Sequence, residues 1–208
     1  MGIRFCFASL LHPAMRNVAE VRRKLGFPTI FNMLGPLTNP AGAQYQLVGV
    51  GRRELRDLLA GALCLLGVEH AAVVHGADGL DEVTLAAMTE VTEVIPGQTQ
   101  FFRWQPEDFG LSREHLDELA ASNPDDSAAL IRAVLAGETG PPRNITVLNA
   151  AAAIWTAGVE RSLTACARRA AAAIDSGAAR ELLVKLAQRT NRCKSVPTRN
   201  ASGEIVDE

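Results

Sequence analysis

Short apolar runs alternate with amphipathic stretches along the first part of the chain. The apolar runs have the length and composition of strands and lie at residues 3–8, 45–50 and 70–76. Residues 13–25 and residues 52–66 lie between them and show the apolar period of a helix. This order pairs neighbouring strands in parallel and places the helices over the sheet. We therefore expect an α/β fold with a mostly parallel sheet flanked by helices.

The pattern changes after residue 76. Short β-rich pieces predict an antiparallel excursion, with a turn at Pro96-Gly97, and they lie at residues 82–87, 89–95 and 98–104. Helical patterns follow, with a break at Ser176-Gly177, at residues 113–121, 127–138, 145–158 and 163–188. The C-terminal third is thus expected to be helical. The pairs Gly35-Pro36 and Asn39-Pro40 predict a rigid turn sequence between the first helix and the strand at residue 45.

Composition and charge narrow the class of protein. The 208 residues are 48% hydrophobic and 21% charged, as in an ordinary globular protein, and the net charge is −2 with no long block of one sign. We therefore expect neither nucleic acid nor a membrane as a partner, since the uncharged runs are also shorter than the roughly 20 residues that cross a bilayer. The four cysteines form no Cys-x-x-Cys pair, which fits a cytoplasmic protein. Residues 1–192 are expected to form one α/β domain, followed by a polar tail at residues 193–208.

Arg22 is the first candidate for chemistry. On the predicted helix it falls on the apolar arc, one turn after Val18 and two turns after Met15. A guanidinium stays charged, so its burial requires an anion and further acceptors. That anion could be a ligand or a carboxylate of the protein, and Arg22 could instead extend its head group to water at the end of the helix.

A cluster of carboxylates is the second candidate. Asp78, Asp81 and Glu82 follow the predicted strand at residues 70–76, and loops at the ends of parallel strands commonly bind ligands. A hard cation such as Mg²⁺ would relieve their mutual repulsion. The alternative is a solvated acidic turn in which the carboxylates accept hydrogen bonds from the backbone.

The remaining candidates are interpreted as structural. His75 is expected to be a hydrogen-bonded core residue, and His70 is expected at the surface. Cys64 and Cys166 lie on apolar helix faces, where cysteine behaves as a small hydrophobic residue. The sequence contains no Walker loop, Gly-x-Gly-x-x-Gly, Gly-x-Ser-x-Gly or His-Glu-x-x-His motif, so dinucleotide-binding and common hydrolase classes lack support.

Four segments resemble one family in both order and character. They are "FCFASLLHPAMRNVAEVRRKLGFPTIFNMLGPLTNPA", "QLVGV", "VVHGADGLDEVTL" and "NAAAAIWTAG". They resemble anthranilate phosphoribosyltransferases from Gly2 to about Leu186. The resemblance implies a glycosyltransferase of family 3 type, a pentosyltransferase of tryptophan biosynthesis. Such an enzyme joins the amine of anthranilate to the ribose of phosphoribosyl pyrophosphate (PRPP) and releases pyrophosphate.

The resemblance also implies roles for individual residues. Arg22 matches the position that faces the anthranilate carboxylate, and His12 matches a residue that lines the same aromatic channel. Asp81 and Glu82 match the acidic pair that holds Mg²⁺ on the pyrophosphate. Residues 86–89, Ala-Ala-Met-Thr, replace a turn that usually contains glycine and proline.

The family also has features upstream of the matched part. These are a helical N-terminal domain, a Gly-Thr-Gly-Gly-Asp pyrophosphate loop and a Lys-His-Gly-Asn segment, none of which occurs among the 208 residues. We therefore expect a C-terminal part that is inactive or nearly so alone, without the helices through which the family forms homodimers. Two alternatives stay open: a noncatalytic nucleic-acid-binding relative, which the near-neutral charge disfavours, and a pyrimidine nucleoside phosphorylase-like enzyme.

Overall fold

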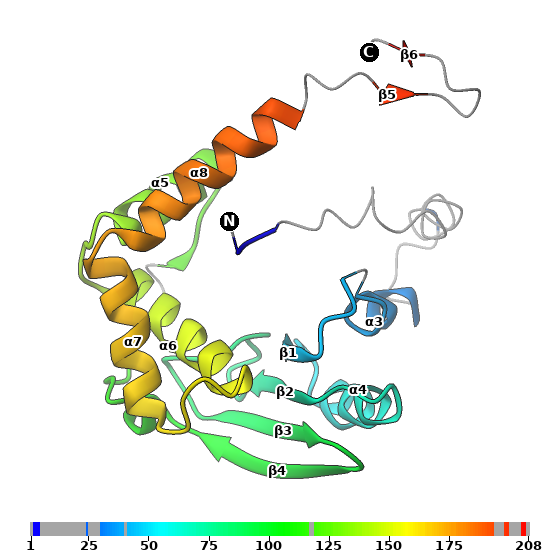
Figure 1. Ribbon diagram of the computed structural model, residues 1–208. Helices are drawn as coiled ribbons and strands as arrows, with labels where there is room; N and C mark the ends of the chain where they lie inside the picture. Colours follow the sequence, from blue (N-terminus) through cyan, green and yellow to red (C-terminus); the bar gives the residue numbers. More distant parts are fainter. Residues whose placement is uncertain are drawn as a thin grey trace.

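A four-stranded sheet lies at the centre of the computed structural model, which describes residues 2–4, 24, 30–39, 41–116, 119–193, 198–199 and 205–206 (Figure 1). Its strands are adjacent in chain order: β1 (Tyr45–Gly49), β2 (His70–Gly76), β3 (Thr89–Ile95) and β4 (Gln98–Trp104). β1 and β2 are parallel, while β2 with β3 and β3 with β4 are antiparallel. Gly97, with φ of 77°, supplies the left-handed residue of the turn between β3 and β4.

Helices cover both faces of this sheet. α4 (Arg53–Leu65) packs on one face, and α6 (Pro141–Thr156) and α7 (Leu163–Asp175) form the layer on the other (Figure 1). β2 serves both layers because successive side chains of a strand point to opposite faces: Ala71 and Val73 belong to the core under α4, and Ala72 and Val74 to the core under α6. Every residue of β2 is buried.

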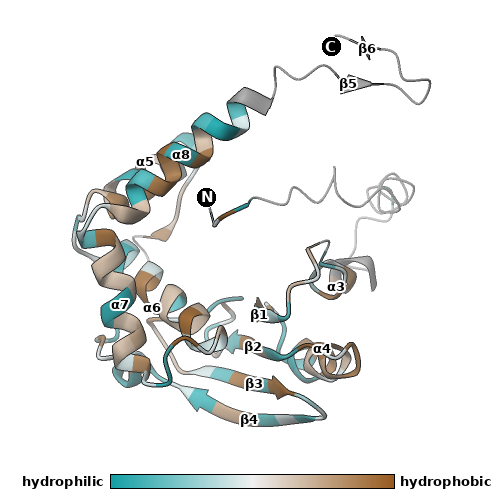
Figure 2. Ribbon diagram, in the orientation of Figure 1, coloured by the Kyte–Doolittle hydropathy of each residue, from teal (hydrophilic) through white to brown (hydrophobic). Residues whose placement is uncertain are grey.

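The other described elements extend from this three-layer core. They are α3 (Ile30–Leu37), the 3₁₀ helix η1 (Pro106–Phe109), α5 (Pro124–Leu135), α8 (Ala178–Cys193) and a pair of two-residue strands, β5 (Thr198–Arg199) and β6 (Ile205–Val206). No helix among these described elements is long and apolar enough to span a membrane. In Figure 2 hydrophilic turns interrupt the apolar ones along α8.

Most of the predicted architecture is confirmed. The α/β class, the antiparallel excursion and the helical C-terminal third are all present, and Gly177, with φ of 77°, makes the predicted break between α7 and α8. Among the described strands only one pair is parallel. The additional strand predicted at residues 3–8 lies largely outside the described residues.

Two local predictions are wrong, and a third is confirmed only in part. Residues 82–87 form a loop, because side chains and not a neighbouring strand bind their amides: Thr89 Oγ1 accepts from the Thr84 N–H at 3.0 Å, and Thr84 Oγ1 accepts from the Ala86 N–H at 3.0 Å. The helix predicted at residues 113–121 is present only in part: residue 119 lies in a 3₁₀ turn, with the Leu119 N–H bonded to Leu116 O at 2.9 Å, while residues 113–116 and 120–121 are not helical. The predicted turn at Gly35-Pro36 is instead inside α3, where proline removes only one donor and the Thr38 N–H still bonds Leu34 O at 3.0 Å.

The two strand histidines are both buried. His75 is a core residue as predicted, with Nδ1 at 2.8 Å from Val50 O. The prediction that His70 lies at the surface is wrong: Nδ1 lies 2.6 Å from Thr156 O at the end of α6, and Nε2 lies 2.7 Å from Glu93 Oε1. Because a carbonyl oxygen can only accept, His70 Nδ1 carries a hydrogen. The end of α6 covers His70, and the Thr156 carbonyl replaces the water molecule that would accept a hydrogen bond from a histidine at the surface.

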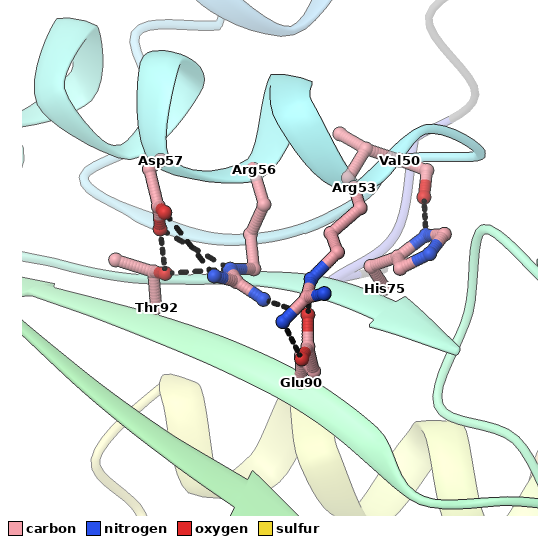
Figure 3. Close-up of polar contacts among 7 residues, drawn as sticks. All are labelled: Val50, Arg53, Arg56, Asp57, His75, Glu90 and Thr92. Atoms are coloured by element: carbon pink, nitrogen blue, oxygen red, sulfur yellow. Dashed lines mark hydrogen bonds and ion pairs between the residues drawn. The ribbon is translucent and has the colours of Figure 1, made fainter. Parts of the chain in front are cut away.

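An ionic network connects α4 to β3 (Figure 3). Arg53 donates two hydrogen bonds to the Glu90 carboxylate at 2.7 and 2.8 Å, and the buried Arg56 donates a third. Arg56 Nε also donates to Thr92 Oγ1 at 2.9 Å, and that hydroxyl donates to Asp57 Oδ1 at 2.6 Å. Burial alone would raise the pKa of Glu90, but the bonds from the two guanidinium groups outweigh it and hold this pKa below its usual value. The sequence did not reveal this network, because Arg56 falls among the polar positions of α4.

Candidate functional site

The candidate site is the loop that follows β2, residues 77–88, which we call the acidic loop. It begins at the edge of the sheet where both parallel strands end, β1 at Gly49 and β2 at Gly76. The Ala77 N–H bonds Met88 O at 2.9 Å and joins the two ends of the loop, and the Gly76 N–H bonds Leu80 O at 2.8 Å. Carboxyl edges of parallel strands are where α/β proteins usually bind ligands.

The three carboxylates of this loop have different surroundings. Asp78 has a structural role: Oδ1 accepts from the Leu80 N–H at 3.2 Å and Oδ2 accepts from Thr84 Oγ1 at 2.6 Å. Asp81 and Glu82 are exposed, and neither forms a hydrogen bond or ion pair with any described residue. The alternative of an acidic turn that accepts hydrogen bonds therefore describes Asp78, whereas no described residue occupies the carboxylates of Asp81 and Glu82.

Two glycines allow the acidic loop to lie against the strand ends. A Cβ atom on Gly49 would lie 1.6 Å from Asp81 O and 2.6 Å from Asp81 C, so only glycine fits beneath the loop at this point. At Gly76 a Cβ atom would lie 2.5 Å from Asp78 Oδ1. The position of the acidic pair is thus tied directly to the ends of β1 and β2.

A helix on the far side of the loop contributes a residue that the sequence reasoning missed. Asn149 of α6 accepts from the Val83 N–H through Oδ1 at 2.9 Å and donates to Val83 O through Nδ2 at 2.9 Å. Val83 immediately follows Glu82. The sequence feature that could have indicated Asn149 is a lone polar side chain within an apolar helical segment. Leu148 and Ala152, which lie near it on α6, are fully buried.

A cavity of about 480 Å³ lies between the acidic loop, α5 and α6, and Glu82 of the pair lines it. Its lining is mainly apolar and includes Leu80, Leu130, Val134 and Ile145, and Glu82 is the one ionisable residue among the described residues that line it. Desolvation on this side and, after it, the neighbouring Asp81 carboxylate raise the pKa of Glu82.

The surroundings of the pair fit a hard cation such as Mg²⁺. Asp81 and Glu82 are adjacent carboxylates that have no partner in the described part of the chain, and the pKa of Glu82 is raised, so a nearby positive charge would stabilise them. No group of three or more His, Cys, Asp or Glu residues in the described part of the chain could hold a metal by itself. Asp81 and Glu82 would therefore share the ion with water or with ligand oxygens, as proteins commonly hold Mg²⁺.

The other two predicted site residues, His12 and Arg22, lie outside the described residues. Their predicted contacts with anthranilate stay predictions. The structure thus brings together Asp81 and Glu82 and adds Gly49 and Asn149 as the residues that hold them.

Comparison with known proteins identifies the family. Residues 1–180 match the glycosyl transferase family, a/b domain. The chain belongs to this family. The resemblance to anthranilate phosphoribosyltransferases that the sequence motifs indicated is confirmed as well, because the curated relatives that match at 45–50% identity carry that name.

Three relatives illustrate the match. An anthranilate phosphoribosyltransferase of Thermomicrobium roseum is 50% identical over 188 residues, which are 89% of this chain and 54% of the relative. The crystal structure of the enzyme from Thermus thermophilus is 42% identical with a TM-score of 0.81, covering 88% of this chain and 54% of that one. The Saccharomyces cerevisiae enzyme in complex with PRPP and Mg is 30% identical with a TM-score of 0.74, covering 84% of this chain and 51% of that one. The chain spans about half the length of the curated relatives it matches.

Proposed function

We propose that this chain forms part of an anthranilate phosphoribosyltransferase, which transfers phosphoribosyl from PRPP to the amine of anthranilate with release of pyrophosphate. The observation that carries the proposal is the pair Asp81 and Glu82 at the carboxyl edge of the sheet, exposed and without a partner among the described residues, in a chain 50% identical to an enzyme of that name. We also propose a cytoplasmic location, one α/β domain at residues 1–192 and a polar tail at residues 193–208.

Asp81 and Glu82 would hold Mg²⁺ together with oxygens of PRPP. When bound, the ion neutralises negative charge on the departing pyrophosphate. The pair itself supplies two carboxylates that face solvent with no competing hydrogen bonds among the described residues. The acidic loop keeps them in place through Gly49 on one side and Asn149 on the other.

Arg22 and His12 would serve the other substrate. A guanidinium can donate two parallel hydrogen bonds to the anthranilate carboxylate, which pairs the charge and orients the ring. Orientation matters because the aromatic amine is neutral at pH 7 and needs correct placement more than deprotonation. His12 would line the channel that receives the ring.

Little turnover is expected from the 208 residues alone. The resemblance assigns pyrophosphate binding to a Gly-Thr-Gly-Gly-Asp loop, and the 208 residues contain no such sequence. We also expect the 208 residues alone not to form the family homodimer, because the resemblance assigns dimerisation to helices upstream of the matched part. We therefore propose that activity appears when the upstream part is supplied.

A chimera tests this proposal. The remainder of the Thermomicrobium roseum relative is placed ahead of residue 1, and pyrophosphate release is measured with anthranilate, PRPP and Mg²⁺. We expect turnover that depends on anthranilate from the chimera and almost none from the 208 residues. The variant Arg22→Ala should raise the KM for anthranilate strongly and leave the KM for PRPP nearly unchanged, while Arg23→Ala, on the predicted polar face, should change neither.

Two results would contradict the proposal. A folded chimera that releases no pyrophosphate, but cleaves thymidine or uridine with phosphate, would assign the chain to the nucleoside phosphorylase alternative. A chimera that keeps full activity when Asp81→Asn and Glu82→Gln are combined would show that the pair has no role in the reaction.

A further inference from the structure

The side chain of Asn149 pairs with both backbone polar groups of the residue next to the acidic pair. Its Oδ1 accepts from the Val83 N–H at 2.9 Å, and its Nδ2 donates to Val83 O at 2.9 Å. We infer that Asn149 is a positioning residue that sets the orientation of Asp81 and Glu82 for a divalent cation. This inference rests on the cation role proposed above for the pair.

Asn149 is itself held in place. Nδ2 donates a further hydrogen bond to Ile145 O at 3.1 Å, one turn earlier on α6. The helix around it is immobilised by Leu148 and Ala152, whose side chains are fully buried in the core under the sheet. A side chain with fixed orientation can impose that orientation on the loop that it binds.

The chemistry of the contact requires an amide. A backbone N–H needs an acceptor and a backbone C=O needs a donor, and asparagine presents one of each side by side. Aspartate of the same shape offers acceptors only, so it keeps the bond from the Val83 N–H and places a carboxylate against Val83 O. Alanine leaves both backbone groups of Val83 without a partner.

The acidic loop cannot easily relax away from this contact. On its other side Asp81 O lies so near to Gly49 that a Cβ atom there would come within 1.6 Å. The segment from Asp81 to Val83 is therefore held between the end of β1 and the side chain of Asn149. Fixing both sides of a three-residue segment fixes the direction in which its two carboxylates leave the backbone.

Mn²⁺ binding to the 208-residue chain tests the inference without any turnover. Mn²⁺ substitutes for Mg²⁺ at oxygen sites, and its effect on water-proton relaxation measures binding. The variant Asn149→Ala should weaken Mn²⁺ affinity roughly 10- to 100-fold, as loss of a residue that orients metal ligands commonly does. The variant Asn149→Asp keeps the bond from the Val83 N–H and the side-chain shape but loses the donor to Val83 O, so it should also weaken Mn²⁺ binding and serves as the second variant where the alanine variant does not fold.

Asn144→Ala is the matched control. Asn144 lies on the same helix and donates to Glu114 Oε1 at 2.7 Å. Its side chain forms no hydrogen bond with the acidic loop among the described residues and reaches it only through Glu114, whose N–H bonds Leu85 O at 3.1 Å and not an atom of Asp81 or Glu82. The variant should lose some thermal stability and keep the Mn²⁺ affinity of the wild type. The double variant Asp81→Asn with Glu82→Gln should abolish binding and so show that the measured ion sits on the pair.

The results distinguish the cation role of Asp81 and Glu82 from the positioning role of Asn149. If the double variant abolishes binding and Asn149→Ala binds Mn²⁺ as the wild type does, the pair is a cation site and the positioning role of Asn149 is wrong. If the double variant binds as well as the wild type, the cation role itself is wrong and the inference falls with it. Equal weakening by Asn144→Ala and Asn149→Ala would show a general loss of stability and also overturn the positioning role.

Discussion

Among the glycines in the described part of the chain, Gly49 is the one where an added methyl group would come closest to the acidic loop, so Gly49→Ala should disturb that loop. The added Cβ atom would lie 1.6 Å from Asp81 O and 2.6 Å from Asp81 C. Ordinary contact between such atoms is near 3.5 Å, so the loop backbone has to move by roughly 2 Å. The obstacle is backbone, and it cannot rotate away as the end of a flexible side chain can.

The expected cost follows from this displacement. Overpacking of this kind destabilises by roughly 1–3 kcal/mol, and in a chain of this size each kcal/mol lowers Tm by roughly 2–4 °C. Mn²⁺ affinity should fall as well, because Asp81 carries one of the two carboxylates and its own carbonyl is the group displaced. Differential scanning calorimetry in EDTA measures the first effect, and water-proton relaxation measures the second.

Gly51→Ala is the control, since no heavy atom lies within 4 Å of the position that its new methyl group would take and its φ is not in the left-handed region. This change should leave Tm the same or raise it slightly, because alanine restricts the unfolded chain more than glycine does. If Gly49→Ala and Gly51→Ala give the same Tm and the same Mn²⁺ affinity, the acidic loop is not seated against the end of β1 and the reasoning is wrong.

Three further predictions concern groups away from the acidic pair. Glu90→Leu should lower the free energy of unfolding in urea titrations by at most roughly 3–5 kcal/mol, because the buried Arg56 loses its buried carboxylate and keeps only the exposed Asp57 as an ionic partner. Adding Arg56→Leu should recover much of that loss, and a double variant no more stable than the single one would contradict this. Because the pKa of Glu90 is lowered on folding, its contribution is complete above the ordinary glutamate pKa of about 4.3 and is lost as pH falls through the lower folded value, so Glu90→Gln should flatten the acid limb of stability against pH. Cys166 is fully buried, and desolvation raises the pKa of its thiol, so iodoacetamide should modify it only in urea, as peptide mass spectrometry can establish.

The sequence was a good guide wherever one local pattern decides the structure. Apolar runs and helical periods predicted β1, β2, α4 and the C-terminal helices, because burial of these faces needs no knowledge of distant partners. The glycine at position 177 marked a true helix boundary for the same local reason. The α/β class follows from these elements alone.

The sequence was a poor guide wherever a residue depends on a partner far along the chain. His70 looked superficial because its partners, Glu93 and the Thr156 carbonyl, lie 23 and 86 residues away. Residues 82–87 have β-forming composition, yet the side chains of Asn149 and Thr89 accept hydrogen bonds from two of their backbone N–H groups, which are therefore not paired with a neighbouring strand. The acidic cluster was found from sequence, but its division into a structural Asp78 and two carboxylates that no described residue binds required coordinates.

Helix α6 is attached to opposite ends of the same strand. Asn149 binds the loop that leaves β2, and the Thr156 carbonyl binds His70, where β2 begins. Sliding α6 along its axis by one residue would break both attachments together, so the helix has a single permitted register against the sheet. The positions of the Asp81 and Glu82 carboxylates consequently depend on how the whole of α6 packs on the sheet. A substitution that breaks the contact between His70 and the Thr156 carbonyl should therefore also shift the acidic loop.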